Sequence, residues 1–265
     1  MKTQTIEIRQ SNAYCTQVWL NRPDVRNAFN DQVIAELTQA FQQIAKDPLV
    51  RVVVLAAHGK AFCAGADLNW MRDMEGYSWE ENKADAQALA DMLWTLDQCP
   101  VPIVGRLQGD CYAGGMGLAA VCDVLVAVDS MNFCLSEARL GLMPATISPY
   151  VIRAMGAQAA RRYMVTSEII TAVEAHRLGF VHQVTSADQI DAVIDSFIQI
   201  LSRNGPQAVK ACKQLVKDVT GQLITQELRA ETAKRIADIR VSDEGKEGLQ
   251  SFLNKRKPNW LPSSS

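Results

Sequence analysis

The stretch "VPIVGRLQGDCYAGGMGLAAVCDVLVAVD", residues 101–129, contains a complete strand, loop, helix and second strand. Its two ends, 101–107 and 123–129, are apolar, rich in valine and short, as buried strands are. The small apolar residues at 114–121 between them suit a helix. Because a helix that joins two parallel strands makes a right-handed crossover, the stretch predicts an α/β fold with a buried parallel sheet.

The same alternation of strands and helices continues toward the N-terminus. "TIEIRQ" and "YCTQVWLN" alternate apolar and polar residues, which predicts two antiparallel strands. Asn30 is placed to cap the helix that follows them. The predicted elements are, in order, strands at 5–10 and 14–21, a helix at about 31–46, a strand at 50–57 and a helix at about 79–98.

After about residue 186 the strand pattern stops and amphipathic helices follow, with breaks at "NGPQ" (204–207) and "VSDEG" (241–245). Their apolar faces have no predicted sheet to cover. We therefore expect a core at 1–199 and a C-terminal helical region at 200–265 that packs on another subunit. The apolar residues of these faces are Leu215, Leu223, Leu228, Ile236, Ile239, Leu249 and Phe252.

The composition limits the classes of function. The 265 residues include 27 basic and 29 acidic side chains, and this near balance disfavours a dedicated binder of nucleic acid or of an anionic membrane. The seven cysteines are scattered with no C-x-x-C pair, which favours reduced, buried thiols. The N-terminus has no apolar signal segment and no run is long enough for a membrane span. We expect a cytoplasmic protein.

The loop "GDCYAGGMGLAAVCD" (109–123) could bind a dinucleotide, a phosphate or another oxyanion. The glycine spacing does not fit the dinucleotide motif, and Met116 and Leu118 stand where a phosphate loop needs its Lys and its Ser or Thr. Backbone N–H groups that point at an oxyanion remain as the functional interpretation. The alternative is that the glycines only ease the packing of helix on strand.

A second turn of small residues, "AFCAGADL" (61–68), follows a buried strand and precedes a helix expected near Asp67. Two such turns could direct two backbone donors at one oxygen. Cys63 in this turn could be a nucleophile, but no His or Lys lies nearby in the sequence to lower its pKa. A packed thiol is therefore favoured.

Glu137 is the candidate acid–base residue. It opens a short helix in "FCLSEARLGLMP" (133–144) with Ser136 as a possible cap. An exposed acid in a first helical turn is the ordinary interpretation. The alternative is a carboxylate beside an apolar pocket whose pKa is raised by desolvation.

The remaining polar groups suggest no metal site. His58, His176 and His182 have no ligand spacing, and we expect them to be structural or on the surface. The basic stretch "NKRKPNW" (254–260) is either a solvated tail or a patch for a phosphorylated ligand.

Five motifs in order give the chain a resemblance to the enoyl-CoA hydratase/isomerase, or crotonase, family. They are "LNRPDVRNAF" (20–29), "AFCAGADL" (61–68), "GDCYAGGMGLAAVCD" (109–123), "FCLSEARLGLMP" (133–144) and "GLQSFLNKRKPNW" (248–260). The resemblance covers nearly the whole chain. It implies a crotonase-like superhelix of stacked ββα units with a C-terminal helical trimerisation region, so that the subunits form a trimer or a dimer of trimers.

The resemblance also implies a site for an acyl-CoA thioester. The backbone amides of Ala66 and Gly114 would bind the thioester oxygen, and Glu137 would be the acid–base residue. No metal or redox cofactor is expected, since coenzyme A is part of the substrate. The residues implied for the CoA channel are Arg26, Ala28, Ala64, Asp67 and Leu68, with Phe252 and Lys255 reaching the nucleotide end of a neighbouring subunit's site.

One position departs from the two-acid hydratases of the family. They carry a glutamate where this chain has Gly117, so a single acid, Glu137, remains. "GADLNWM", "FCLSEARLGLMPATISPYV" and "GLQSFLNKRKPNW" resemble the bacterial 3-methylglutaconyl-CoA and isohexenylglutaconyl-CoA hydratases, which share the glycine. Both substrates carry a second carboxylate, for which Arg72 and Arg139 are candidate partners. Candidates for the acyl wall are Trp70, Met74, Tyr77, Tyr112 and Met143.

Three hypotheses follow. The first is a hydratase of a branched, carboxylated enoyl-CoA in leucine or acyclic terpene breakdown. The second is a Δ3,Δ2-enoyl-CoA isomerase, which also needs one acid. The third, a non-catalytic RNA-binding protein, is disfavoured by the near-neutral charge.

Overall fold

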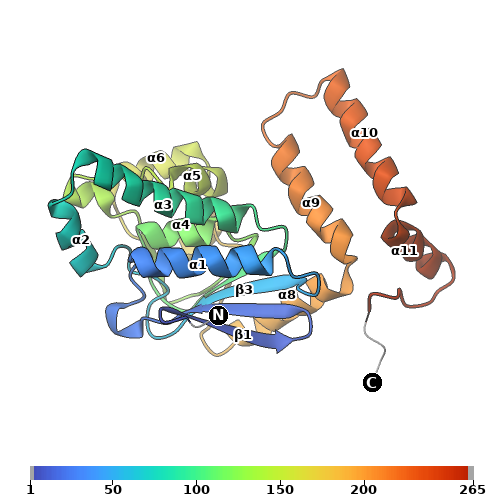
Figure 1. Ribbon diagram of the computed structural model, residues 1–265, viewed down its shortest axis with the longest axis horizontal. Coiled ribbons are helices and arrows are strands. Elements are labelled where there is room, and N and C mark those ends of the chain that lie inside the picture. The colour runs from blue at the N-terminus through green and yellow to red at the C-terminus, as the bar shows by residue number, and fades with distance from the viewer. Residues whose placement is uncertain (1–2, 262–265) are drawn as a thin grey trace.

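A six-stranded sheet forms the centre of the computed structural model, which describes residues 3–261 (Figure 1). The extreme ends of the two expected regions, 1–2 and 262–265, lie outside the described residues. The first two strands pair antiparallel and the other strands are parallel, which confirms the predicted α/β fold. The sheet order is β1 (Ile6–Asn12), β2 (Cys15–Leu20), β3 (Val52–Ala57), β4 (Ile103–Leu107), β6 (Val124–Val128) and β9 (Gln183–Thr185).

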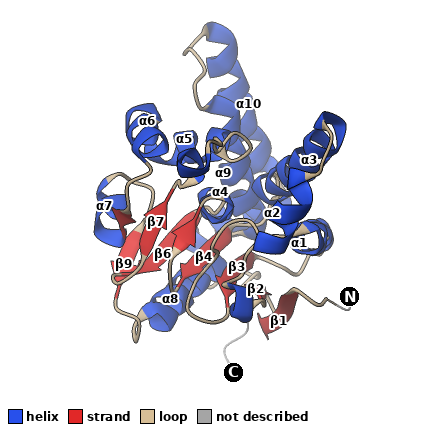
Figure 2. Ribbon diagram, turned by 90° about the vertical axis from the view of Figure 1, so that its left-hand side faces the viewer, coloured by secondary structure: helices blue, strands red, loops and turns tan. Residues whose placement is uncertain are grey.

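Helices cover both faces of this sheet, which is why every residue of β3 is buried (Figure 2). α8 contacts β3, β4 and β6 on one side, while α1, α3 and α4 lie across the other. The helices of this body are α1 (Asp31–Ile44), α2 (Leu68–Glu75), α3 (Trp79–Asp97), α4 (Gly114–Ala120), α5 (Ser148–Met155), α6 (Ala157–Thr166), α7 (Ala172–Arg177) and α8 (Ile190–Arg203), with 3-10 turns η1 (Pro23–Val25) and η2 (Glu137–Leu140).

The predicted cap and apolar face of α1 are confirmed. The Asn30 side chain accepts a hydrogen bond from the Val33 backbone N–H at 3.0 Å. The apolar positions that repeat at helical spacing along α1, including Leu37 and Phe41, are buried against the core. The helix ends at Ile44, two residues before the predicted end.

A second sheet of three short strands, which the sequence did not reveal, lies beside the first. It has the order β5 (Cys111–Tyr112), β7 (Asn132–Cys134) and β8 (Ile170–Thr171). Strands of two or three residues carry no readable alternation, so sequence periodicity could not find them. β5 and β7 are parallel, and Tyr112 pairs with Cys134. The chain segments that leave these two strands therefore start at the same edge.

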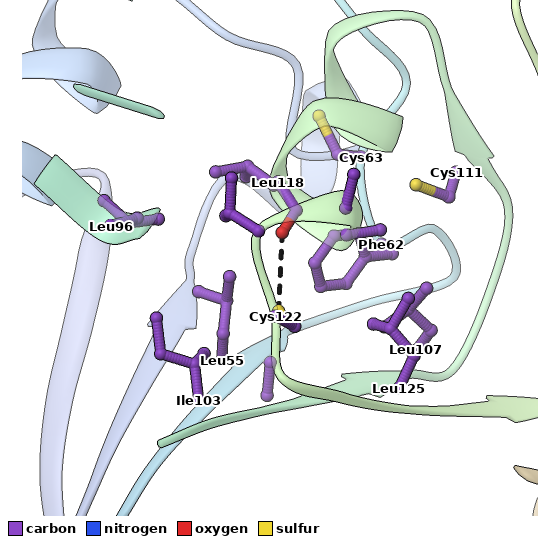
Figure 3. Packing of buried hydrophobic residues seen from close by; sticks show 14 of the residues in the cluster. Leu55, Phe62, Cys63, Leu96, Ile103, Leu107, Cys111, Leu118, Cys122 and Leu125 are labelled. Atoms are coloured by element: carbon purple, nitrogen blue, oxygen red, sulfur yellow. Dashed lines mark hydrogen bonds between the residues drawn. The ribbon is translucent and has the colours of Figure 1, made fainter. Parts of the chain in front are cut away.

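Figure 3 shows the core where β3, β4 and β6 meet α4. Leu55, Leu107 and Leu125 pack with Leu118, and the Cys122 thiol donates to the Leu118 carbonyl at 3.4 Å. All seven cysteines are free, as expected, and six are buried. Cys212 is exposed, so the expectation of burial is wrong at that position because its helix packs little on the body.

The last helices extend away from the body as an arm, residues 206–253 (Figure 1). The arm consists of α9 (Pro206–Val219), α10 (Gln226–Val241) and α11 (Asp243–Leu253). Its predicted breaks at 204–207 and 241–245 are confirmed, and a third break at 220–225 was not predicted. Ion pairs join α9 to the body, including Lys213 with Asp123 at 2.6 Å. Leu223 and Phe252 are 83% and 79% exposed in the single chain.

No helix within residues 3–261 is long and apolar enough to cross a membrane.

Replacing Phe41 by Ala should lower the free energy of unfolding by about 3–5 kcal/mol, because a fully buried ring leaves a cavity. Urea unfolding followed by circular dichroism would measure the change. Gln39→Ala, on the exposed side of the same helix, is the matched control and should change stability by less than about 0.5 kcal/mol. Equal effects of the two variants would contradict the burial of this face.

Candidate active site

The turn 61–68 and the loop 109–117 are bonded to each other along their length. Cys63 and Cys111 form a parallel bridge, and the Tyr112 N–H donates to the Cys63 carbonyl at 2.9 Å. Gly65 has φ +94°, and a Cβ added to it would lie 3.0 Å from the Ala113 Cβ. Glycine is needed at this position because of its backbone conformation and because the two turns adjoin.

The Ala66 amide points out of this turn with no partner. Phe29 donates to the Gly65 carbonyl and accepts from the Asp67 N–H, both at 2.7 Å. This is a parallel bridge, in which the neighbours of Ala66 face Phe29 and Ala66 directs its own N–H to the opposite side. Within residues 3–261 the Ala66 N–H donates no hydrogen bond, so it is available to an acceptor.

Within the described residues, 3–261, the Gly114 amide donates no hydrogen bond either. Ala113 before it has φ 47° and ψ −122°, a conformation that costs a non-glycine residue about 1–3 kcal/mol, and its N–H donates to the Cys134 carbonyl at 2.8 Å. Gly114 then begins α4, where an N–H has no intrahelical partner. A Cβ on Gly114 would lie 3.0 Å from the Phe29 ring. The ring therefore packs against the backbone at this residue.

Glu137 follows β7, whose end lies beside the end of β5, so the carboxylate and the Gly114 amide leave the small sheet at one edge. Within the described part of the chain, Glu137 Oε2 is buried and has no hydrogen-bond partner. Burial raises the pKa of Glu137 above its ordinary value. The interpretation as a desolvated acid is therefore favoured over that of an exposed first-turn residue. Ser136 makes no capping bond, so its predicted role is wrong: η2 is a 3-10 turn.

Ile147 fills the space beside Gly117. A Cβ added to Gly117 would lie 2.4 Å from Ile147 Cγ2 and 3.0 Å from Ile147 Cβ, which is too close for any side chain. Both residues are buried. The position of the second acid is therefore closed by an apolar side chain. The sequence reveals the missing acid, but it gives no signal that Ile147 packs there. Gly117 lies in α4 and Ile147 immediately before α5, so the two residues are far apart along the chain.

The residues expected to line the CoA channel adjoin one another in part. The Ala64 N–H donates to the Arg26 carbonyl at 3.1 Å, which brings 26–28 beside 64–68, and Arg26 and Leu68 are exposed. Asp67 is buried, and its oxygens accept from the Asn69 N–H and from Arg22, each at 2.8 Å.

Phe252 and Lys255 lie at and beyond the end of α11, on the far side of the molecule from α2 (Figure 1). One chain does not bring these two residues to the site.

The candidate cations are both exposed. Arg139 donates to the Ser167 carbonyl and Arg72 to the Asn69 side chain at 2.8 Å. Neither forms an ion pair within residues 3–261, so the guanidinium group of each is available to pair with a carboxylate of a ligand. Of the expected wall residues, Trp70 is buried, Met143 is 77% exposed, and the Tyr112 hydroxyl donates to Asp110 at 3.0 Å. Met74 and Tyr77 are half-buried.

The other candidate groups have structural roles. Cys63 is fully buried, and burial raises the pKa of its thiol to about 12, which favours the packed thiol over a nucleophile. Each histidine has a local partner: His58 pairs with Glu7 and stacks on Trp19, while His176 and His182 bond backbone groups. No group of three potential metal ligands occurs within 3–261.

Two backbone amides on adjoining turns have no acceptor within residues 3–261, and Glu137 Oε2 is a buried oxygen without a partner there. Groups of these kinds are the parts from which an acid–base centre with an oxyanion hole is built. The profile of the enoyl-CoA hydratase/isomerase family matches residues 10–262. The chain belongs to this family of enzymes, which confirms the family and fold that its motifs predicted.

Individual relatives are similar to this chain over nearly the full length of both proteins. The solved structure of an enoyl-CoA hydratase from Shewanella pealeana ATCC 700345 has a TM-score of 0.94 and 40% identity, covering 98% of this chain and 97% of that one. The 2,3-dehydroadipyl-CoA hydratase of Escherichia coli (strain K12) is 29% identical over 91% of this chain and 92% of its own. The mevalonyl-coenzyme A hydratase of Aspergillus fumigatus is 28% identical over 92% and 90%.

Replacing Gly117 by Ala should lower the free energy of unfolding by about 1–3 kcal/mol, because the added methyl group overlaps Ile147. In an Ile147→Ala background the same change should have a clearly smaller effect, since the nearest atom, Cγ2, is gone. A double-mutant cycle measured by urea unfolding tests this coupling. Simple additivity would contradict the contact.

Replacing Glu137 by Gln should stabilise the fold at neutral pH. Because burial raises the pKa of Glu137, the folded state binds that proton more tightly than the unfolded state, and stability falls as pH rises from the ordinary carboxyl pKa through the folded value. Gln stays neutral and avoids this loss. Thermal melts should place the variant above the parent at pH 7, with the difference shrinking at about pH 4. A constant difference would count against a desolvated carboxyl group.

Proposed function

We propose that this enzyme adds water across the double bond of a branched, carboxylated enoyl-CoA, of the 3-methylglutaconyl-CoA or isohexenylglutaconyl-CoA type, in leucine or acyclic terpene catabolism. The observation that carries the proposal is Glu137 Oε2, which is buried and has no hydrogen-bond partner within residues 3–261, together with the amides of Ala66 and Gly114, which have no acceptor there. Glu137 and Gly114 follow paired strands of the small sheet. The site supplies both an oxyanion hole and one acid–base group. Coenzyme A enters as part of the substrate, and no metal or redox group is required.

The chemistry follows from these three groups. The Ala66 and Gly114 N–H groups donate to the thioester oxygen, and their hydrogen bonds strengthen as negative charge develops there. Glu137 takes a proton from water while the hydroxyl oxygen bonds to the β-carbon, and the resulting enolate keeps its charge at the oxyanion hole. Protonated Glu137 then returns the proton to the α-carbon, which restores the carboxylate. The raised pKa favours this transfer near neutral pH.

A carboxylated substrate is supported by the two free arginines and by relatives. Arg139 lies two residues beyond Glu137, and neither it nor Arg72 is paired with an acid of residues 3–261, so either could bind a distal carboxylate. The names of two relatives denote a dicarboxylic acyl group, dehydroadipyl, and a methyl-branched one, mevalonyl. The apolar closure at Ile147 is compatible with water held by Glu137 alone.

We also propose that the arm is the oligomerisation region, within a trimer or a dimer of trimers. Its exposed apolar side chains, such as Leu223 and Leu249, need a cover that one chain does not supply. Phe252 and Lys255 at its end would then reach the nucleotide end of a neighbouring subunit's substrate. This arrangement would use residues that lie far from the site in a single chain (Figure 1).

A Δ3,Δ2-enoyl-CoA isomerase is the second candidate, because one acid can also carry a proton between two carbons of the substrate. The single carboxylate of the site favours both reactions equally. Product formed in ¹⁸O-water separates them, since hydration places the label in the product and isomerisation does not.

Replacing Glu137 by Gln should lower kcat at least about 100-fold, the lower end of the range for one acid–base group, while acyl-CoA binding persists. Steady-state kinetics with 3-methylglutaconyl-CoA and isohexenylglutaconyl-CoA measure the first effect, and calorimetric titration with a saturated acyl-CoA measures the second. Asp24→Asn, an exposed acid in η1, is the control and should retain full activity. Full activity of the Glu137 variant would refute the assignment.

A further inference from the structure

The guanidinium group of Arg22 joins the two chain segments that flank the Ala66 amide. Its Nη1 donates to the Ala28 carbonyl at 2.6 Å and its Nη2 to Asp67 Oδ2 at 2.8 Å. The Asp67 side chain is 7% exposed and the Arg22 side chain 21%. Both contacts are charge-assisted or short, and both lie largely out of water, where such bonds hold geometry best.

These contacts close a ring around Ala66. Ala28 precedes Phe29, which bonds Gly65 on one side of Ala66 and Asp67 on the other. Arg22 then returns from Asp67 to Ala28. Rotation of the Gly65–Asp67 segment would break at least one of these bonds, so the ring fixes the direction of the Ala66 N–H.

The ring is anchored to the main sheet. Arg22 and Asn27 bond each other, since the Arg22 N–H donates to Asn27 Oδ1 at 2.9 Å and the Asn27 N–H donates to the Arg22 carbonyl at 2.8 Å. The Asn27 amide donates to the carbonyls of His58 and Ala61, directly after β3. Burial alone would raise the pKa of Asp67, but hydrogen bonds from Asn69 and Arg22 hold it below its ordinary value, which keeps the carboxylate charged.

We propose that Arg22 is a positioning residue that, through Asp67 and Ala28, holds the Ala66 N–H in the direction needed to bind the thioester oxygen. Arg22 acts through the loop and does not touch the substrate. This inference rests on the proposed oxyanion hole. It assigns Asp67, with Arg22, to the pair of residues that we call the brace, because both Asp67 oxygens already accept hydrogen bonds.

Arg22→Met removes the fork and keeps a long side chain. A misdirected donor should lower kcat about 10- to 100-fold with little change in KM, because a displacement of about 1 Å or the loss of one donor has effects of this order. Arg22→Lys should recover only part of the activity, since an ammonium group cannot bridge both acceptors as the planar fork does.

A coloured thioester, dimethylaminocinnamoyl-CoA, reports the hydrogen bonds directly, because its absorption moves to longer wavelength when the carbonyl is polarised. Wild type and Glu137→Gln should both shift the band of the bound probe. Arg22→Met should bind the probe with a smaller shift. Arg106→Met, which removes the ion pair with Asp191 at 2.6 Å on β4, is the matched control and should shift the band as wild type does.

If Arg22→Met folds poorly, Asp67→Asn provides the second variant, since it keeps an oxygen for the Asn69 N–H but loses the charge that Arg22 binds. A lowered melting temperature with an unchanged band shift and kcat would overturn the inference and leave Arg22 a structural role. If neither wild type nor Glu137→Gln shifts the band of the bound probe, the oxyanion hole itself is refuted, and the positioning role with it. A normal wild-type shift that survives in both brace variants would refute the positioning role alone.

Discussion

The close contact of two backbone turns is the constraint on which the site depends. A side chain would be strained at Gly65, which has φ +94° and a 3.0 Å approach to the Ala113 Cβ, and at Gly115 a Cβ would lie only 2.8 Å from Cys63. Since the turns meet backbone to backbone, two N–H groups remain unpaired at one place. Ala113, which adjoins Gly65 in this contact, adopts a conformation that residues other than glycine avoid.

Glu137 lowers the stability of the fold at neutral pH. Glu137 loses hydration and its Oε2 has no hydrogen-bond partner within residues 3–261, so burial raises its pKa and its position weakens the fold at neutral pH. The neighbouring position shows the other solution. At Gly117 the chain gives up an acid, and Ile147 packs the space with an apolar side chain. Glu137 therefore keeps a buried polar oxygen, whereas the space beside Gly117 is apolar core.

The end of the arm could reach a candidate site only if chains associate. Phe252 and Lys255 lie at and beyond the end of α11, on the far side of the molecule from α2, while exposed leucines along the arm leave an apolar surface uncovered in one chain. By contrast, the contacts of Arg22 with Ala28 and Asp67, which we propose orient the Ala66 amide, form within a single chain. The proposed orientation of the Ala66 amide therefore needs only one subunit, whereas the proposed contacts to the nucleotide need an assembly of subunits.

The sequence by itself determined the parallel strands, the cap of α1 and the family, because periodicity, capping and motifs are carried by residues close together along the chain. Asn30 and the valines of β3 are examples. Only the tertiary structure decided that Glu137 is desolvated, that Ile147 fills the place beside Gly117, and that Arg22 binds Asp67 across 45 residues. Those contacts join segments distant in sequence, and packing in three dimensions, which no local pattern encodes, brings them together.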